Sequence, residues 1–409
     1  MSNWQNLSNP DIQNFIAAHA KDDVRNLALK KSPHPDWPYS LIMDQIKSRQ
    51  KAAIKMPSWL AVSNIIFPPS DIIEQASSEA TARYKSSLVS GKSFTDLTGG
   101  SGLDSAVILD KFETARIIDL NPDNAAIIAH NIALLSDKNV TVENTSAEAF
   151  IQTMQPTDLA LIDPQRRENK SGKRGLYKFE DCSPNIFDLL PTLKNKAQHI
   201  MIKTSPMLDI DQGIIQIENT GLHVRDVHVV EWQGDCKELL FILTPDKKAE
   251  TQITAVAIND DGAPIRSFTF TRTEENMAHC PIAAPTKYLY EPSPAFMKAG
   301  AFNLMATQYG LHKLHHATHL YSGDALATDF PGRIFEITQS LPVNKKAIKP
   351  HITNGKANIA VRNFPMRPPE LAKKLGLKDG GDDYLFACKT QTESKEQNAL
   401  LLCKKLFSN

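Results

Sequence analysis

The chain has 409 residues, 41% of them hydrophobic and 22% charged, so we expect two to four globular domains. It contains no apolar run close to the ~18 residues that span a bilayer, and its start lacks the pattern of a signal peptide. The five cysteines are scattered and never form a C-x-x-C pair, which argues against a disulfide framework and a structural zinc site. We therefore predict a cytoplasmic protein without a membrane contact.

Charge is unevenly distributed along the chain although the formal net charge is zero. Residues 1–90 carry a net charge of +2, residues 91–340 one of −9, and residues 341–409 one of +7. A basic end beside an acidic middle indicates that a polyanion would be bound mainly by the ends, although a solvated lysine-rich surface gives the same count.

Residues 1–90 are predicted to be helical. Apolar residues recur at helical spacing in 15–31 and 41–56, and the prolines between these segments separate them. A third helix is expected over 71–89, with Ser70 as its N-cap.

From Ser93 onward, short apolar runs alternate with amphipathic segments. This alternation is typical of a parallel sheet with right-handed helical crossovers. The expected strands are 93–97, 115–119, 140–143, 159–162 and 200–203, and the expected helices are 103–111, 123–135, 147–154 and 184–193.

This block ends with two strands, 222–231 and 238–243, joined by a short connection that contains Gly234 and Asp235. A connection that short permits only an antiparallel hairpin. A parallel sheet that closes on an antiparallel hairpin resembles the class I methyltransferase fold, whereas a Rossmann dehydrogenase is expected to stay parallel. The predicted fold is therefore a doubly wound, seven-stranded α/β sheet of the class I methyltransferase type, preceded by helices and followed by small α+β domains.

The remainder of the chain contains a further hairpin around Asp261-Gly262 and two short α+β patterns. The first pattern is strand, helix, strand, strand, and the second is strand, helix, strand, strand with many basic residues. The domains we predict are a helical segment (1–90), a cofactor-binding domain (91–246), a hairpin connection (247–284), an α+β module (285–340) and a basic α+β module (341–409).

A glycine-rich loop follows the first predicted strand, running from Asp96 through Thr98, Gly99, Gly100 and Gly102 to Asp104. Its glycines allow a sharp turn and a close approach of backbone to a ligand. The free N–H groups that follow favour an anionic group such as a carboxylate. Asp96, at the strand end, is placed to hydrogen-bond the amino-acid portion of such a ligand, although glycine turns after strands are often purely structural.

Asp119 ends the second predicted strand, 17 residues after Gly102. A carboxylate at that point can accept hydrogen bonds from both ribose hydroxyls of an adenosine, and Leu120 follows it in the same loop. NAD also presents a ribose there. Its G-x-G-x-x-G pattern, however, requires a third small residue where this chain has Ser105, and it leaves the final hairpin unexplained.

The loop after the third strand is expected to contact the adenine. Class I methyltransferases often place an acid there, whereas this chain has Ser146, with Glu148 two residues later. Ser146 is the predicted contact, and the choice between Ser146 and Glu148 stays open.

The fourth strand ends in Asp163-Pro164-Gln165-Arg166-Arg167, at the edge of the sheet that faces the ligand crevice. Asp163 could accept a hydrogen bond from the methyl acceptor and align it, and alignment is the main requirement of a displacement. Arg166 or Arg167 could bind a phosphate or form an internal ion pair. Lys203 or Ser205 at the end of the fifth strand could hold the substrate, and Tyr177 could stack on a base. The predicted catalytic set is Asp163, Pro164, Arg166 and Lys203.

Two other chemistries are disfavoured. Cys182 and Cys236 have no neighbouring histidine that would activate a thiolate, so covalent catalysis is not expected. His315 and His316 lie in an H-x-x-H-H-x-x-H string, and in a strand they would point to opposite faces, so no metal site is predicted.

Several motifs together resemble one bacterial family of class I methyltransferases, and the resemblance runs from about residue 60 to the end. The motifs are 74–85, 96–104, 163–167, 203–209, 232–238 and 363–371. Members carry a C-terminal ferredoxin-like domain and a THUMP-like domain. The resemblance implies the cofactor S-adenosylmethionine and, by analogy with other THUMP proteins, a structured RNA substrate such as tRNA or rRNA. It also suggests that Gln75 and Thr81 line the cofactor pocket or pack beside it.

Three functions remain open on the sequence: an RNA methyltransferase, a small-molecule methyltransferase, and a non-catalytic RNA-binding protein. The first accounts for the glycine loop, Asp119, the terminal hairpin and the basic end together. The acceptor atom, the modified nucleotide and the oligomeric state are not determined by the sequence.

Overall fold

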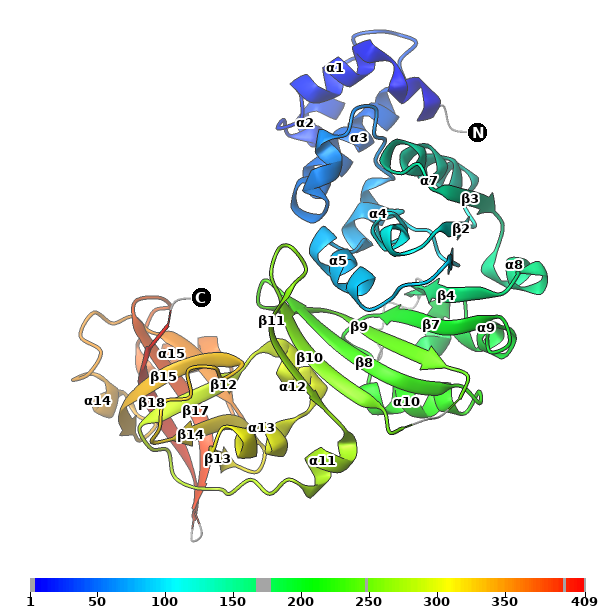
Figure 1. Cartoon of the computed structure of the whole chain (residues 1–409). Helices are drawn as coiled ribbons and strands as arrows, with labels where there is room; N and C mark the ends of the chain where they lie inside the picture. Colours follow the sequence, from blue (N-terminus) through cyan, green and yellow to red (C-terminus); the bar gives the residue numbers. More distant parts are fainter. Residues whose placement is uncertain (1–3, 167–177, 247–248, 393–394, 408–409) are drawn as a thin grey trace. The chain divides into compact units, whose positions relative to one another are not determined.

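The computed structural model describes residues 4–166, 178–246, 249–392 and 395–407. The chain divides into two compact units, the first comprising 1–252 with 256–265 and the second 253–255 with 266–409 (Figure 1). No helix in the described ranges is both long and apolar enough to cross a membrane.

The first unit begins with the helices η1 (Trp4–Ser8), α1 (Pro10–Ala18), α2 (Val24–Ala28), α3 (Tyr39–Lys55), η2 (Pro57–Ala61), α4 (Ser70–Gln75) and α5 (Glu79–Ser87). Of these, α1 and α3 share a core that contains Ile12, Ile16, Ile42 and Ile46. The single helix expected over 15–31 is two helices, because the Asp23 side chain accepts a hydrogen bond from Arg25 N–H and starts α2.

The helix expected over 71–89 is also two helices. Ser78 starts α5 through a reciprocal capping box with Thr81, which ends α4 at Gln75. The prediction that Ser70 is an N-cap is wrong, because Ser70 is the first residue of α4 and the preceding Pro69 makes no capping bond.

A mixed sheet has the order β11-β10-β8-β9-β7-β4-β1-β2-β3; β10 and β11 contain residues of both units, and its other strands belong to the first unit. Strands β3, β2, β1, β4 and β7 are mutually parallel, whereas β9 is antiparallel to both β7 and β8. The strands are β1 (Ser93–Asp96), β2 (Thr114–Asp119), β3 (Asn139–Asn144), β4 (Thr157–Ile162), β7 (Ala197–Thr204), β8 (His223–Trp232), β9 (Asp235–Thr244), β10 (Gln252–Ile258) and β11 (Pro264–Phe270). The expectation of an α/β fold is confirmed, and the sheet has nine strands rather than seven.

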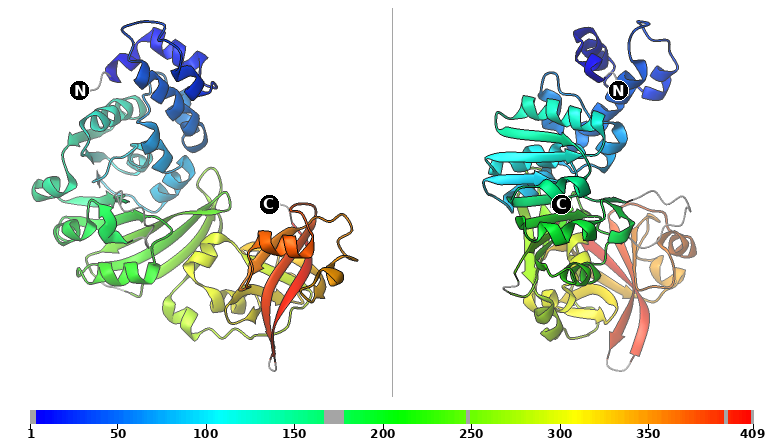
Figure 2. Two further views of the ribbon diagram at one scale, coloured as in Figure 1. Left: turned by 180° about the vertical axis from the view of Figure 1, so that it is seen from behind. Right: turned by 90° about the vertical axis from the view of Figure 1, so that its right-hand side faces the viewer.

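Helices cover the sheet of the first unit (Figure 2). They are α6 (Leu103–Ile108), η3 (Leu109–Lys111), α7 (Pro122–Leu135), α8 (Ala147–Thr153), α9 (Ile186–Leu193) and α10 (Ile210–Glu218). The strand order reverses between β1 and β4, and right-handed connections then put α6 and α7 on one face and α9 on the other. Phe94, Ile117 and Leu161 are buried in one core with residues of α6 and α7.

The short strands β5 (Gln165–Arg166) and β6 (Cys182–Ser183) pair beside the end of β4, near η4 (Phe179–Asp181).

The second unit contains a seven-stranded sheet in the order β13-β14-β12-β15-β18-β17-β16. Its strands are β12 (Tyr288–Pro292), β13 (His312–His315), β14 (Thr318–Gly323), β15 (Gly332–Leu341), β16 (Asn358–Arg362), β17 (Asp383–Thr392) and β18 (Lys395–Lys405). Its helices are α11 (Arg272–Met277), α12 (Pro294–Ala299), α13 (Phe302–Gln308), α14 (Lys345–Ile348) and α15 (Pro368–Leu375). The strands of both expected α+β modules therefore belong to one sheet.

Candidate active site

A cleft of about 670 Å³ lies at the carboxyl ends of β1, β2 and β4, where the strand order reverses. Ligands of doubly wound sheets bind at this position. We call it the main cleft; among its lining residues are the predicted Thr98, Gly100, Asp119, Leu120, Ser146, Asp163 and Arg166. A smaller cavity of about 30 Å³, which we call the side cleft, is lined by the predicted Gln75, Asp96, Thr98, Gly99, Gly100 and Asp163.

The glycine loop turns between β1 and α6 through two residues in the left-handed region, Gly100 (φ 56°) and Gly102 (φ 76°). Such angles strain residues with a side chain. Gly99 is needed for another reason, since a Cβ atom there would lie 2.8 Å from the Ile128 side chain. The loop thus places bare backbone at both clefts.

Asp96 is 2% exposed and organises the loop from within. One carboxylate oxygen accepts a hydrogen bond from Thr98 N–H at 2.9 Å, and the other accepts one from the Ser105 hydroxyl. Burial raises the pKa of Asp96 to about 7, although these hydrogen bonds oppose the shift. Ser105, which replaces the third glycine of a dinucleotide pattern, thus has a specific role in shaping this loop.

Asp119 ends β2 and lines the main cleft. Its carboxylate accepts hydrogen bonds from Gly100 N–H (3.1 Å), Asn121 N–H (2.8 Å) and the Asn124 side chain (2.7 Å). Burial raises its pKa despite these bonds. Asn124 also donates to the Gly100 carbonyl, so it links the glycine loop to the acid; sequence reasoning missed this residue.

The adenine end of the predicted site contains Ser146 and Glu148, both at the wall of the main cleft. The Ser146 hydroxyl accepts a hydrogen bond from Ala149 N–H at 3.2 Å and caps α8. Leu120 is 73% exposed beside them and offers an apolar surface. The structure therefore leaves the alternative between Ser146 and Glu148 open.

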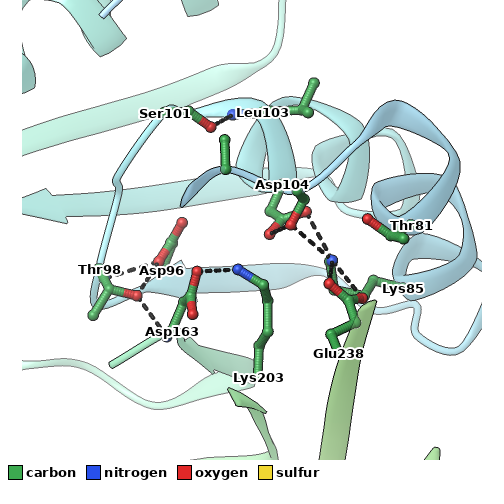
Figure 3. A network of polar contacts seen from close by, with 12 residues as sticks. Thr81, Lys85, Asp96, Thr98, Ser101, Leu103, Asp104, Asp163, Lys203 and Glu238 are labelled. Carbon is green, nitrogen blue, oxygen red and sulfur yellow. Dashed lines mark hydrogen bonds and ion pairs between the residues drawn. The ribbon is translucent and has the colours of Figure 1, made fainter. Parts of the chain in front are cut away.

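Asp163 lines both clefts and forms an ion pair with Lys203 (Figure 3). Its backbone N–H donates to the Thr98 hydroxyl at 2.7 Å, which ties the end of β4 to the glycine loop. Burial alone would lower the pKa of Lys203, but Asp163, Asp104 and Glu238 outweigh it and raise that pKa. Lys203 therefore stays charged and keeps the Asp163 carboxylate fixed.

Several predicted residues lie elsewhere. Lys203 lines neither cleft, and its amine reaches the site only through Asp163. Pro164 is buried. Thr81 is buried in the capping box of α5 and lines neither cleft, so its role is in capping and packing. Arg167 and Tyr177 lie outside the described residues.

A buried charge network behind the clefts was not anticipated from the sequence. The Lys85 amine, 0% exposed, lies 2.8 and 2.9 Å from the two carboxylate oxygens of Glu238 and 3.2 Å from Asp104 (Figure 3). It also donates to the Ser77 hydroxyl at 3.0 Å. Helix periodicity alone does not reveal this partner set, because Glu238 is 153 residues away along the chain.

The structure shows where the cysteines and histidines considered in the sequence analysis lie. Cys182 and Cys236 line neither cleft. The prediction that His315 and His316 point apart is wrong, because β13 ends at His315 and the rings lie 4.0 Å apart.

His315, His316 and Glu396 form a group close enough to hold a metal ion. Nδ1 of His315, however, accepts a hydrogen bond from Ala317 N–H at 3.0 Å, so Nε2 carries the proton, and Glu396 accepts from it at 3.2 Å. This arrangement favours a hydrogen-bond network over a metal centre.

Two family models match the second unit. Residues 288–331 match a ferredoxin-like domain, and residues 332–405 match a THUMP domain-like model.

Relatives from two bacterial species match most of the chain. A crystal structure of a candidate methyltransferase from Porphyromonas gingivalis W83 is 29% identical, with a TM-score of 0.85 over 97% of this chain and 98% of that one. An uncharacterised S-adenosylmethionine-dependent methyltransferase of Mycobacterium tuberculosis is 23% identical over 81% of this chain and 87% of its own length.

By its fold and by these relatives, the chain is similar to S-adenosylmethionine-dependent methyltransferases. Within that class, the chain resembles the members that carry a ferredoxin-like domain followed by a THUMP-like domain. The family resemblance, the enzyme class and the cofactor expected from the sequence are confirmed at the level of these relatives.

Proposed function

We propose that the chain transfers a methyl group from S-adenosylmethionine directly to a structured RNA. The observation that carries the proposal is the main cleft, where the glycine loop and Asp119 meet Asp163 at the switch point of the sheet. The strands β3-β2-β1-β4-β7-β9-β8 would form the methyltransferase core, with its final antiparallel hairpin. The domain boundaries given above belong to the same proposal.

The residues present suit the cofactor. Asp119 would accept hydrogen bonds from the ribose hydroxyls, Ser146 or Glu148 would contact the adenine, and the glycine loop with Asp96 and Gln75 would surround the methionyl part. When bound, S-adenosylmethionine supplies an electrophilic methyl group.

Asp163 would orient the acceptor group by accepting its hydrogen bond, as an anion held by Lys203. Arg166, at the wall of the main cleft, would contact a substrate phosphate. No cysteine lines either cleft in the described part of the chain, which supports direct transfer over a covalent intermediate.

The RNA assignment is supported by the THUMP domain-like match and by exposed lysines on α14 and α15, namely Lys345, Lys346, Lys373 and Lys374. The Lys345 side chain lies beside Gly376, the cap residue that follows α15, so α14 lies next to the end of α15. Such a patch complements a phosphate backbone.

The test is transfer of a tritiated methyl group from S-adenosylmethionine to total cellular RNA, compared with a small-molecule extract. The wild-type chain should label RNA. Asp163→Asn should lose at least about 100-fold in turnover because its amide no longer matches the anion that orients the acceptor, while its affinity for S-adenosylhomocysteine stays within about threefold. Labelling of the small-molecule extract alone would overturn the RNA assignment. Loss of S-adenosylhomocysteine binding in Asp163→Asn would overturn the role of Asp163 in orienting the acceptor.

A further inference from the structure

Two arginines of the second unit share one buried carboxylate. Glu291 on β12 is 4% exposed, and each of its two carboxylate oxygens binds a different arginine. Arg333 on β15 donates to Oε2, from Nε at 2.7 Å and also from Nη2, and Arg362 at the end of β16 donates from Nη2 to Oε1. We call Arg333 and Arg362 the arginine pair. Because guanidinium groups stay charged in proteins, the positive charge here exceeds the negative charge by one.

Both guanidinium groups reach the surface although the carboxylate between them is buried. The Arg333 side chain is 39% exposed and the Arg362 side chain 41%. Nη1 of Arg333 and Nε of Arg362 have no hydrogen-bond partner among the residues that the structure describes, and neither arginine has a second acid there. One arginine would be enough to neutralise Glu291. The additional charge and these N–H groups are therefore available to an anion from outside the chain.

Both arginines are held in place before a ligand binds. The guanidinium carbon of Arg333 lies 5.7 Å from the centre of the Phe335 ring. Nη1 of Arg362 donates to the Val361 carbonyl at 2.7 Å. Asn363, the next residue, has φ 50°, and its side-chain amide donates to a threonine hydroxyl of β14 at 3.3 Å. Side chains that are already ordered lose little rotamer freedom on binding, which favours affinity.

The arginine pair lies where the two matched domain models meet. Glu291 belongs to residues 288–331, which match the ferredoxin-like domain, whereas Arg333 and Arg362 belong to residues 332–405, which match the THUMP domain-like model. None of the exposed lysines of α14 and α15 takes part in it. The pair is therefore a second basic feature of this unit, and it depends on both matched segments.

We propose that Arg333 and Arg362 bind a phosphate group of an RNA backbone, with Glu291 as the residue that positions both guanidinium groups. The planar N–H groups of arginine match the oxygens of a phosphate, and the excess of one positive charge matches the single negative charge of a phosphodiester. The inference rests on the proposed function and adds to it a specific point of contact with the RNA.

The test measures the affinity of the full chain for fluorescently labelled bulk tRNA over a range of salt concentrations. Bulk tRNA is a suitable probe because phosphate contacts do not depend on sequence. Arg333→Gln and Arg362→Gln each leave Glu291 with one arginine. Each should weaken binding about 5- to 10-fold and lower the slope of log affinity against log salt by about one.

Arg116→Gln is the matched control. Arg116 on β2 is 46% exposed, is also paired with a glutamate, and lines neither cleft. It removes the same charge and should leave both the affinity and the slope close to those of the wild type.

Arg333→Lys and Arg362→Lys decide the matter if a glutamine variant does not fold. Lysine keeps the charge but not the planar N–H groups, so the slope should stay and the affinity should fall about two- to threefold. Lysine variants that bind as tightly as the wild type would contradict the proposed contact.

Unchanged slopes in both glutamine variants, or an equal change in Arg116→Gln, would overturn the inference and leave the arginine pair a purely structural feature. The proposed function would then still stand. A wild-type chain that binds S-adenosylhomocysteine but no tRNA would instead overturn the RNA assignment, and the inference with it.

Discussion

Asp96 makes the stability of the first unit depend on pH near neutrality. Its pKa of about 7 lies above the ordinary value of 3.8, so the folded protein holds a proton that the unfolded chain releases. Stability therefore falls as pH rises from about 4 to about 7. Asp96→Asn cannot ionise, and relative to wild type it should gain about 2–3 kcal/mol between pH 5 and pH 8.

Chemical denaturation at the two pH values measures this difference, with Asp110→Asn as the control that should follow wild type. A difference between Asp96→Asn and wild type that does not change with pH would contradict the account of Asp96.

Residues at strand ends were the ones that the sequence could identify. Asp96, Asp119 and Asp163 each follow an apolar run, and the carboxyl ends of parallel strands meet at one edge of a sheet. Lys85 could not be identified, because a lysine in an amphipathic helix is normally exposed and its partners Asp104 and Glu238 come from other elements. The sequence predicted that Lys203 contacts the substrate directly. The structure instead shows its amine bound to Asp163, a contact that the sequence could not reveal.

At the scale of elements, the ion pair between Lys85 on α5 and Glu238 on β9 joins the helix before the cofactor strand to the last strand of the sheet. Both side chains are nearly inaccessible, so removing one partner leaves a buried charge uncompensated. Lys85→Met should cost about 3–5 kcal/mol, whereas Lys85→Met with Glu238→Met should recover about 2 kcal/mol or more of that loss. Urea denaturation of Lys85→Met, Glu238→Met and the double variant measures the coupling, and additive losses of the two single variants would show that the pair is not coupled.

Regular elements were predicted well where periodicity was long and caps were clear. The alternating strands and helices between Ser93 and Thr204 follow their apolar runs closely. Breaks inside elements were missed when local chemistry decided them. The capping box of Ser78 and Thr81 divides the helix expected over 71–89, and Asp23 starts a second helix inside the one expected over 15–31.

At the scale of the whole molecule, the basic end cannot be tested by deletion, because β16, β17 and β18 are part of the same sheet as β12 to β15. Lys345, Lys346, Lys373 and Lys374 are exposed, so we expect the fold to stay intact when all four are replaced by glutamine. RNA affinity should fall about 5- to 20-fold, and the salt dependence of binding should become shallower by about two ions or more.

The control for this experiment replaces four exposed lysines of the first unit, Lys21, Lys30, Lys31 and Lys47, and so removes the same charge. Equal effects of the two sets would mean that net charge alone determines binding, and would remove the support for a specific RNA surface.

The sequence predicted the two α+β patterns but not that their strands form one sheet. Local pattern specifies strands and helices, whereas the pairing of β15 with both β12 and β18 depends on contacts between segments far apart in the chain.

The central claim is that the cleft binds S-adenosylmethionine, and calorimetric titration with S-adenosylhomocysteine, with NADH in parallel, tests it most directly. The account predicts micromolar binding of S-adenosylhomocysteine. It predicts no binding of NADH, because the glycine loop lacks the third glycine and the sheet closes on an antiparallel hairpin. Folded protein that binds NADH, or that fails to bind S-adenosylhomocysteine, would contradict this claim.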